Sequence, residues 1–360
     1  MNSGILLLKF YFCKMKTHQH YMQRCIELAK KGLGSTYPNP LVGSVIVAND
    51  VIIGEGWHKK AGEAHAEVNA ISSVKDKSLL KNATIYVSLE PCSHFGKTPP
   101  CCDLILKNEI PNIVIGTVDP FAKVAGTGIA KLVAEGKNVT VGVLEDECNE
   151  LNKRFFTFHT QKRPYIILKW AETADGFIAP ETKEVKEPVW ISNAISKQLV
   201  HKWRTEEQGI LVGKYTALDD NPELTARLYK GNNPTRILID RNNDVPANFK
   251  IKNKEAKTIV LNETRQETEG NITYDTLNFT KKTIQQIVNK LYEHNIQSVI
   301  IEGGANSLQH FINANYWDEA RVFIGNSTFK KGTAAPQLKN AKLIAKETIL
   351  NDQLSIYKNI

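Results

Sequence analysis

The chain has 360 residues, which is enough for two domains of ordinary size. Its composition, 42% hydrophobic and 23% charged, is that of a folded globular protein and excludes an intrinsically disordered one. A formal net charge of +8 is compatible with nucleic acid, an anionic membrane or small phosphorylated ligands, but Lys and Arg form no block of five or more, so charge alone selects no polymer partner.

The N-terminal segment 4–13 is apolar but short, and Lys9 interrupts it. As a signal-peptide core it is weak, because Lys14 and Lys16 follow it rather than precede it. We expect residues 1–14 to be a disordered extension, with Met15 as the true start. No apolar run in the chain approaches the roughly 20 residues that cross a bilayer, so we expect no membrane partner.

The six cysteines show no evenly spaced disulfide framework, and only Cys101 and Cys102 adjoin. A chain of this length does not need disulfides to fold. The pattern predicts a reducing, cytoplasmic location in which the central cysteines serve chemistry.

The first half alternates helices and strands. Helical spacing of apolar residues predicts a helix over 18–33 that ends at two glycines. Two β-rich runs, 42–48 and 51–57, are separated by Asn49-Asp50, which predicts a hairpin. Further strands are predicted at 84–88, 113–117 and 139–143, and helices near residues 65, 101 and 128. This order indicates an α/β domain with helices packed on a mixed sheet.

The alternation is interrupted over residues 146–163, where the sequence turns polar and then aromatic and basic. We place a boundary near residue 160, which predicts domains 15–160 and 161–360. The second half is again α/β. Its strands are predicted at 165–170, 210–212, 236–239, 258–261 and 298–301, and its helices at 195–206, 282–294 and 306–315.

A candidate zinc site is the strongest functional signal: His65-Ala66-Glu67, then Pro91-Cys92, then Cys101. Zinc prefers nitrogen and thiolate ligands, and a catalytic site uses three of them and leaves the fourth position to water. Bound water then has a pKa of about 7. Glu67 lies two residues from His65, so its carboxyl group can sit beside the metal without binding it and can carry protons. The H-x-E…P-C order is typical of zinc nucleobase deaminases.

The predicted elements place these residues suitably. His65 begins a helix, and Cys101 opens another behind Pro99-Pro100, where the helix N-terminus favours a thiolate. The alternative is a closed structural zinc site, which needs a fourth ligand; His94 or Cys102 could offer one. An H-x-E pair or a single Pro-Cys has little specificity by itself, so the inference rests on their joint order.

The spacing departs from the usual P-C-x-x-C, because eight residues (SHFGKTPP) separate Cys92 and Cys101. This longer loop resembles that of the bifunctional riboflavin-biosynthesis deaminase–reductase family. The resemblance covers the chain from about Met15 and is carried by four strings in this half: PNPLVGSVIV at 38–47, GEGWHKKAGEAHAEVNA at 54–70, VSLEPCSHFGKTPPC at 87–101 and VDPFAKVAGTG at 118–128.

The resemblance implies a cytidine-deaminase-like α/β/α domain that holds Zn²⁺ through His65, Cys92 and Cys101, with Glu67 as the catalytic residue. It further implies that Asn39 and His58 hold the pyrimidine and that Lys97 lies near the substrate phosphate. The alternative for Lys97 is a solvated loop cation.

The second half has no G-x-G-x-x-G after a strand, so a Rossmann fingerprint is not what binds a cofactor here. A strand instead runs into Glu302-Gly303-Gly304-Ala305-Asn306 and then a helix. Small residues let backbone N–H groups approach a pyrophosphate, and the helix N-terminus favours its charge. Such a turn can equally be only a tight connection.

Other segments of this half resemble the reductase half of the same family, which has a dihydrofolate-reductase-like α/β fold and uses NADPH. The resemblance implies that the cofactor contacts Ala171, Trp190, Thr216, Asp220, Gly304, Ala305 and Asn306. It implies that the phosphorylated pyrimidine substrate contacts Lys169, Arg204, Leu224, Arg227 and Glu302.

Two arginines can hold a phosphate by charge-assisted hydrogen bonds, and opening a ribose ring needs a proton donor. Lys169 and Asp220 are the candidate catalytic residues, with their individual roles left open. The alternatives are a helix-surface cation for Arg204 and a turn-capping carboxylate for Asp220. Phe177 stands where the family more often has Lys, and the segment 179–188, ending in Pro188, is longer and more charged than usual, which puts some substrate contacts in doubt.

Two other functions remain open. A nucleic-acid deaminase acting on transfer RNA fits the basic charge but leaves the second half and the long inter-cysteine loop unexplained. A non-catalytic zinc-stabilised binding protein would have four protein ligands on the metal. We expect a small-molecule substrate and no nucleic-acid partner, and by family resemblance a homo-oligomer is plausible. NADPH is not distinguished from NADH by the residues themselves.

Overall fold

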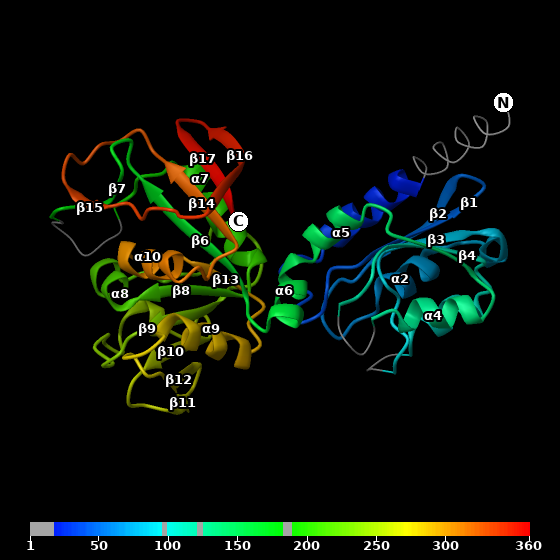
Figure 1. Cartoon of the computed structure of the whole chain (residues 1–360), viewed down its shortest axis with the longest axis horizontal. Helices are drawn as coiled ribbons and strands as arrows, with labels where there is room; N and C mark the ends of the chain where they lie inside the picture. The colour runs from blue at the N-terminus through cyan, green and yellow to red at the C-terminus, as the bar shows by residue number, and fades with distance from the viewer. Residues whose placement is uncertain (1–17, 96–98, 121–124, 183–188) are drawn as a thin grey trace. The chain divides into compact units, whose positions relative to one another are not determined.

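The computed structural model describes residues 18–95, 99–120, 125–182 and 189–360 (Figure 1). The chain divides into two compact units, Met1–Gln161 and Lys162–Ile360, which we call the N-terminal and C-terminal units. The expected extension at 1–14, Lys97 and Pro188 lie outside the described residues. None of the helices in the described ranges is long and apolar enough to span a membrane.

The N-terminal unit is built on a five-stranded sheet with the order β2-β1-β3-β4-β5. Strand β1 runs antiparallel to both β2 and β3, whereas β3, β4 and β5 are mutually parallel. The predicted hairpin is confirmed, because Ala48 pairs with Val51 across the Asn49-Asp50 turn. The strands are β1 (Gly43–Ala48), β2 (Val51–Trp57), β3 (Thr84–Leu89), β4 (Asn112–Thr117) and β5 (Asn138–Val141).

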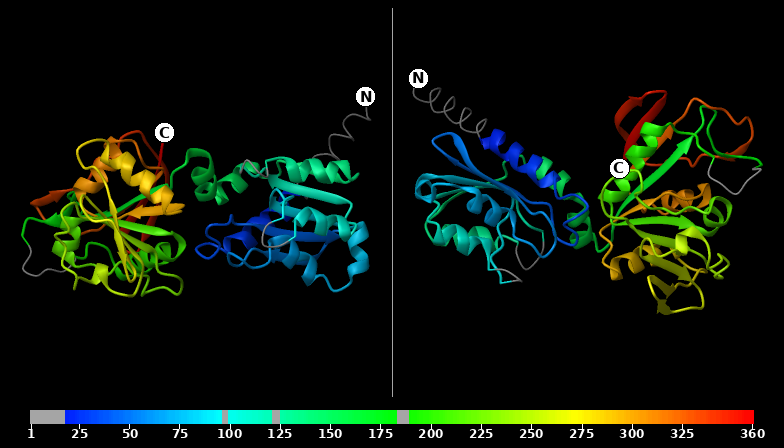
Figure 2. Two further views of the ribbon diagram at one scale, coloured as in Figure 1. Left: turned by 90° about the horizontal axis from the view of Figure 1, so that it is seen from below. Right: turned by 180° about the vertical axis from the view of Figure 1, so that it is seen from behind.

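Helices cover both faces of this sheet, because alternate residues of each strand point to opposite sides (Figure 2). In β1, Ile46 packs with α2 (Ala66–Ser73), α3 (Cys101–Lys107) and α4 (Thr127–Ala134). The neighbouring Val45 and Val47 pack on the other side, with the helical residues 18–30 and α5 (Glu145–Leu151). The unit is therefore a three-layered α/β/α structure.

The stretch that interrupted the predicted alternation is helical. It forms α5 and then α6 (Lys153–Gln161). Three acidic residues occupy the first turn of α5, where their negative charges interact favourably with the positive end of the helix dipole. On the same helix, Cys148 and Leu151 are buried. In α6, Phe155 and Phe158 are buried and lie three residues apart. These helices are too short for their apolar spacing to stand out in the sequence.

The C-terminal unit is built on a ten-stranded sheet with the order β11-β12-β10-β9-β8-β13-β6-β14-β17-β16. Its strands from β12 to β14 in this order are parallel, and antiparallel strands complete both edges. A separate two-stranded sheet joins β7 (Phe177–Pro180) and β15 (Gly332–Ala334). The ten strands are β6 (Tyr165–Glu172), β8 (Gly209–Gly213), β9 (Thr235–Ile239), β10 (Thr258–Asn262), β11 (Glu267–Glu269), β12 (Ile272–Thr276), β13 (Ser298–Ile301), β14 (Glu319–Ile324), β16 (Ala341–Ile349) and β17 (Asp352–Asn359).

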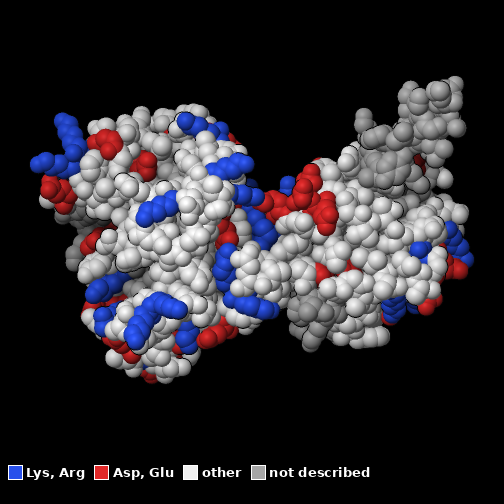
Figure 3. Space-filling view, viewed as in Figure 1, with Lys and Arg blue, Asp and Glu red and all other residues white. Residues whose placement is uncertain are grey.

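Two helices pack on each face of this sheet. Helices α9 (Thr283–Glu293) and α10 (Ala305–Asn313) share one core with one set of strand residues. Helices α7 (Ala194–Glu206) and α8 (Lys214–Asp220) share the other core with the alternate set. Basic and acidic side chains are interspersed over the visible face of the C-terminal unit, whereas on the visible face of the N-terminal unit the acidic side chains gather mainly in one patch (Figure 3).

The predicted strands and helices of this unit are present, with ends shifted by a few residues. No prediction was made for α8, for the strands β7, β11 and β12, or for the strands after residue 316. Strand β14 is buried on both faces and β16 is largely exposed, so neither shows the alternation of a half-buried strand.

Candidate active sites

The three predicted metal ligands come from the ends of three elements of the N-terminal unit. His65 is the N-cap of α2, Cys101 is the first residue of α3, and Cys92 lies in the turn after β3. Helix α3 starts at Cys101 because Pro100 stands just before it, at a position where the missing N–H of proline costs no helical hydrogen bond. The predictions that His65 begins one helix, that Cys92 follows a strand and that Cys101 opens the next helix are confirmed.

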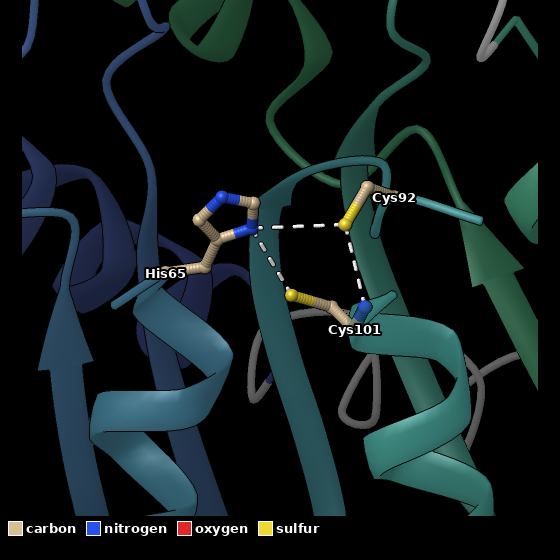
Figure 4. Close-up of side chains that lie close together, drawn as sticks. All are labelled: His65, Cys92 and Cys101. Carbon is tan, nitrogen blue, oxygen red and sulfur yellow. Dashed lines mark hydrogen bonds between the residues drawn. The ribbon is translucent and has the colours of Figure 1, made fainter. Parts of the chain in front are cut away.

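The three side chains converge on one point (Figure 4). Nδ1 of His65 lies 3.3 Å from Sγ of Cys101 and 3.6 Å from Sγ of Cys92. A tetrahedral zinc with bonds of about 2.0 Å to nitrogen and 2.3 Å to sulfur holds such atoms about 3.5 Å apart. The donor set and its spacing therefore fit zinc. The Cys101 hydrogen bond and the nearby His65 lower the pKa of Cys92 and outweigh its burial, which favours the thiolate form.

Glu67 is buried in the first turn of α2, beside the three ligands. Burial, aided by the negative charge of Cys92, raises the pKa of Glu67 to about 7, although His65 and a hydrogen bond with Cys101 oppose the rise. A carboxyl group in this state can both take and give a proton near neutral pH. It is not one of the metal-ligand cluster, as predicted.

The two alternative fourth ligands point elsewhere. Sγ of Cys102 donates to the carbonyl oxygens of Pro91 at 3.3 Å and Gly128 at 3.7 Å, and the residue is buried in the helix packing. His94 is exposed. Within the described part of the chain, the only group able to hold a metal has three members, which leaves the coordination open.

Asn39 and His58 lie together at the rim of this site. The amide of Asn39 contacts Nε2 of His58 at 3.0 Å, and Nδ1 of His58 contacts the carbonyl oxygen of Ala64 at 3.2 Å. Burial, and then the charge of His65, lowers the pKa of His58, so its ring is neutral. With Nδ1 donating to Ala64, Nε2 must accept from the Asn39 amide, and the His58 and His65 rings are 5.5 Å apart.

The sequence reasoning missed Glu90, which precedes the Pro91-Cys92 turn. This buried carboxylate accepts backbone N–H bonds from Asp119 and from the start of α4, at 2.9 Å from both Gly126 and Gly128. A Cβ on Gly128 would lie 2.2 Å from the Pro91 carbonyl oxygen, so that position requires glycine. Glu90 therefore joins the turn that carries Cys92 to the loop before α4.

The C-terminal unit contains a cavity of about 430 Å³ at the carboxyl ends of its parallel strands. All twelve residues predicted for the reductase site line it: Lys169, Ala171, Trp190, Arg204, Thr216, Asp220, Leu224, Arg227, Glu302, Gly304, Ala305 and Asn306. The reasoning missed other lining residues, including Tyr215 on the unpredicted α8 and Ser307 on α10. Phe177 is not among the lining residues, whereas Ile178 and Ala179 are.

A buried ion-pair network lies in this cavity. Glu302 accepts from Nζ of Lys169 at 2.9 Å and from Arg204 at 2.7 Å. Burial alone would raise the pKa of Glu302, but the two cations and their hydrogen bonds lower it to about 2. Arg204 also donates to the Thr225 carbonyl oxygen, so it is no helix-surface cation.

The predicted glycine turn lies between β13 and α10. Gly304 has φ +55°, which disfavours other residues, and a Cβ there would lie 3.2 Å from the hydroxyl of Thr216. Gly303 is tighter, since its Cβ would lie 2.7 Å from Cβ of Val212 on β8. Gly304 is also the N-cap of α10, so no side chain there occupies the first N–H groups of the helix. This cradle fits a pyrophosphate.

The remaining predicted residues lie around the same cavity. Leu224 has φ +58°, rare for a residue with a branched side chain. Arg227 is half-exposed, and its nearest acidic group, on Glu223, is 3.9 Å away. Trp190 is 56% exposed and stacks under Nζ of Lys197 at 3.4 Å. Together these side chains place cationic and aromatic groups at one opening.

Comparison with known protein families divides the chain as its contacts do. The family model described as RibD C-terminal domain matches residues 164–338, and that described as cytidine and deoxycytidylate deaminase zinc-binding region matches residues 15–117. The riboflavin biosynthesis protein RibD of Aquifex aeolicus is 40% identical over 325 residues, which covers 89% of this chain and 90% of that protein. The Escherichia coli protein of the same name is 34% identical and covers 85% and 87%.

Two crystal structures are similar over nearly the whole chain. A diaminohydroxyphosphoribosylaminopyrimidine deaminase/5-amino-6-(5-phosphoribosylamino)uracil reductase from Thermotoga maritima is 36% identical with a TM-score of 0.88, covering 96% of this chain and all of that one. Acinetobacter baumannii RibD is 30% identical with a TM-score of 0.86, covering 96% and 99%. These similarities confirm the predicted fold class, cytidine-deaminase-like in the first half and dihydrofolate-reductase-like in the second.

Proposed function

Since the chain belongs to the family of bifunctional riboflavin-biosynthesis deaminase–reductases, we propose that it deaminates and then reduces one phosphorylated pyrimidine. The first substrate would be 2,5-diamino-6-ribosylamino-4(3H)-pyrimidinone 5′-phosphate. The predicted domain 15–160, which lies in the N-terminal unit, would release an amino group as ammonia, and the predicted domain 161–360, which contains the C-terminal unit, would reduce the ribosyl group to ribityl with NADPH.

The observation that carries the proposal is the convergence of His65, Cys92 and Cys101 beside the buried Glu67. These three ligands would hold zinc, which supplies Lewis acidity to its fourth ligand. The carboxyl of Glu67 would take a proton from the attacking water and give it to the leaving amine, and its buried position in the first turn of α2, beside the ligands, supports this role.

The orientation of Asn39 supports its role in holding the pyrimidine. Because its NH₂ group donates to His58, its carbonyl oxygen is the atom left to accept from an amino group on the ring. Neutral His58 would keep Asn39 in this orientation. Lys97 would contact the substrate phosphate; it lies outside the described residues.

In the C-terminal unit NADPH would supply the hydride, with its pyrophosphate on the Gly304 turn and Ala305 and Asn306 at the helix N-terminus. Ala171, Trp190, Thr216 and Asp220 would line the rest of its site. The deaminated intermediate would be bound by Leu224, Glu302 and the three cations Lys169, Arg204 and Arg227. Arg204 is already held by Glu302, so half-exposed Arg227 is the better candidate for the phosphate. Lys169 or Asp220 would donate the proton that opens the ribose ring.

The test is a two-step assay on the purified chain and on Glu67→Gln. We expect one zinc per chain in both proteins, and ammonia release from the diaminopyrimidine nucleotide reduced at least about 100-fold in the variant. NADPH oxidation with the deaminated intermediate should be unchanged. Glu55→Gln, which removes a surface ion pair with Arg24 in the same unit, is the matched control and should deaminate normally.

Ammonia release that survives in Glu67→Gln would contradict the proposal, as would a metal with four protein ligands. Release from folded RNA, with none from the nucleotide, would instead identify a nucleic-acid deaminase. Comparing NADPH with NADH in the second step measures the cofactor preference directly.

A further inference from the structure

A buried histidine stands just outside the reductase cavity. His201 lies on α7, one helical turn before Arg204, and is 4% exposed. It is not among the residues that line the cavity. Three charged residues that line the cavity, Arg204, Arg227 and Glu302, lie close enough for their charges to act on its ring. A polar ring placed there needs an explanation, because burying it without hydrogen bonds is costly.

The ring of His201 contacts the backbone at both ends of one turn. Its Nδ1 lies 3.5 Å from the backbone nitrogen of Leu228, and the ring also hydrogen-bonds the backbone of Thr225. The N–H of Leu228 can only donate, so Nδ1 accepts and the ring proton is on Nε2. Between these two contacts lie Ala226 and Arg227.

The same turn is held from other sides. Arg204 donates to the Thr225 carbonyl oxygen at 3.0 Å, and the Ala226 N–H donates to Asn233 at 2.9 Å. The Tyr229 N–H closes the turn on the Ala226 carbonyl oxygen at 2.9 Å. Arg227 itself is half-exposed, and within the described residues its ion pair is the 3.9 Å one with Glu223, so its guanidinium is placed chiefly by its backbone.

We propose that His201 is a positioning residue for the reduction step: it fixes the Thr225–Leu228 turn so that the Arg227 guanidinium meets the phosphate of the intermediate. This rests on the proposed phosphate-binding role of Arg227. His201 itself touches neither substrate nor cofactor. Its neutral ring is what the turn requires, because a second ring proton would face the Leu228 N–H.

The experiment is a double-mutant cycle on the full chain with His201→Ala, Arg227→Ala and the pair. KM and kcat are measured for the deaminated, phosphorylated intermediate, together with KM for NADPH. We expect Arg227→Ala to raise KM for the intermediate roughly 10- to 100-fold, the value of a hydrogen bond to a charged group. His201→Ala should raise it about tenfold, with kcat and the NADPH KM changed less than about twofold.

Coupling distinguishes positioning from a general loss of structure. Once Arg227 is removed, removing His201 should have little further effect on KM, so the two single effects should not add. His201→Gln, whose amide offers one donor and one acceptor, should recover most of the affinity. His294→Ala is the matched control, because that histidine pairs with Asp275 in the same unit and neither residue lines the cavity.

The experiment can contradict the phosphate role of Arg227 and the positioning role of His201 independently. If Arg227→Ala leaves KM for the intermediate unchanged, the phosphate role of Arg227 is wrong. If Arg227→Ala raises KM but His201→Ala does not, or if the two effects add fully, the positioning role of His201 is wrong. A loss of kcat and of NADPH affinity in His201→Ala that Gln does not recover would also overturn it.

Discussion

Nζ of Lys169 lies 2.9 Å from Oε1 of Glu302, because β6 and β13, which ends just before Glu302, run side by side in register. On β6 and β13, Leu168 pairs with Ile301, so the next residue of each strand meets its partner at the carboxyl edge of the sheet. The pair is largely buried, and Glu302 also binds Arg204. A separation of 133 residues in sequence thus becomes a direct contact.

The first prediction concerns this network. Glu302→Gln leaves two buried cations without a counter-charge, which typically costs about 3–5 kcal/mol. We expect the C-terminal unit to unfold at lower urea concentration, and NADPH oxidation to fall, while ammonia release is retained. Urea titration followed by tryptophan fluorescence measures the change. Glu267→Gln, in an exposed pair with Arg265, should cost less than about 1 kcal/mol; an equal loss in both variants would contradict the prediction.

The second prediction uses two neighbouring cysteines. Cys101→Ala removes a proposed zinc ligand and should abolish both stoichiometric zinc and deamination. Cys102→Ala removes a thiol that contacts only backbone oxygens among its recorded partners, so zinc should stay at one per chain. Metal analysis after dialysis against a chelator provides the measurement. Zinc loss in Cys102→Ala would show that the metal site is closed by a fourth ligand.

The third prediction concerns Glu90. Glu90→Gln replaces a carboxylate oxygen by an NH₂ group opposite backbone N–H donors, so at least one of these donors loses its partner. We expect the N-terminal unit to lose about 2–3 kcal/mol of stability and to deaminate more slowly. Reductase activity should be normal. Thermal unfolding and ammonia release test this together; a variant as stable as the parent would show that Glu90 does not hold the loop.

The fourth prediction is a pH dependence. Burial, and then the charges of Arg204 and Arg227, lower the pKa of His201 to about 4, against about 6.5 in an unfolded chain. Between these values the unfolded state binds a proton that the folded state excludes. The free energy of unfolding therefore falls as pH falls from about 6.5 to 4, and above pH 6.5 His201 causes no such loss. Glu302 affects stability at lower pH, because its pKa is lowered to about 2 and its carboxylate stabilises the fold until the pH falls toward that value.

The measurement is the urea midpoint of the C-terminal unit at pH 7 and pH 5. His201→Gln removes the titrating ring, so its midpoint should fall less than that of the parent chain between the two values. Identical falls in His201→Gln and the parent would contradict the prediction.

Much of the N-terminal site could be predicted from the sequence, because its residues are joined by short segments. His65, Cys92 and Cys101 follow two β–α turns of recognisable composition, and the hairpin before them has a clear turn signal. Glu90 could not be found this way. Its importance comes from backbone N–H groups near residue 126, and no side-chain pattern marks those donors.

In the C-terminal unit the parallel strands β6 and β8, which line the cavity, were predicted, but the strand order was not, and neither were β7 and β15, which also contribute lining residues. The contact of β6 with β13, and of β13 with β8, is decided by packing between distant segments. The placement of Lys169 against Glu302 follows from that order. His201 reads in sequence as one more residue of an amphipathic helix, since its partners are backbone atoms of a separate turn.

The span of each site along the chain has a consequence for biosynthesis. The proposed zinc ligands are complete once residue 101 has left the ribosome, so a metal could assist folding of the nascent N-terminal unit. The reductase cavity draws on residues from 169 to 333, and strands β14 to β17 follow near the end. A dinucleotide therefore meets a complete set of lining residues only once residue 333 has been synthesised, close to the end of translation.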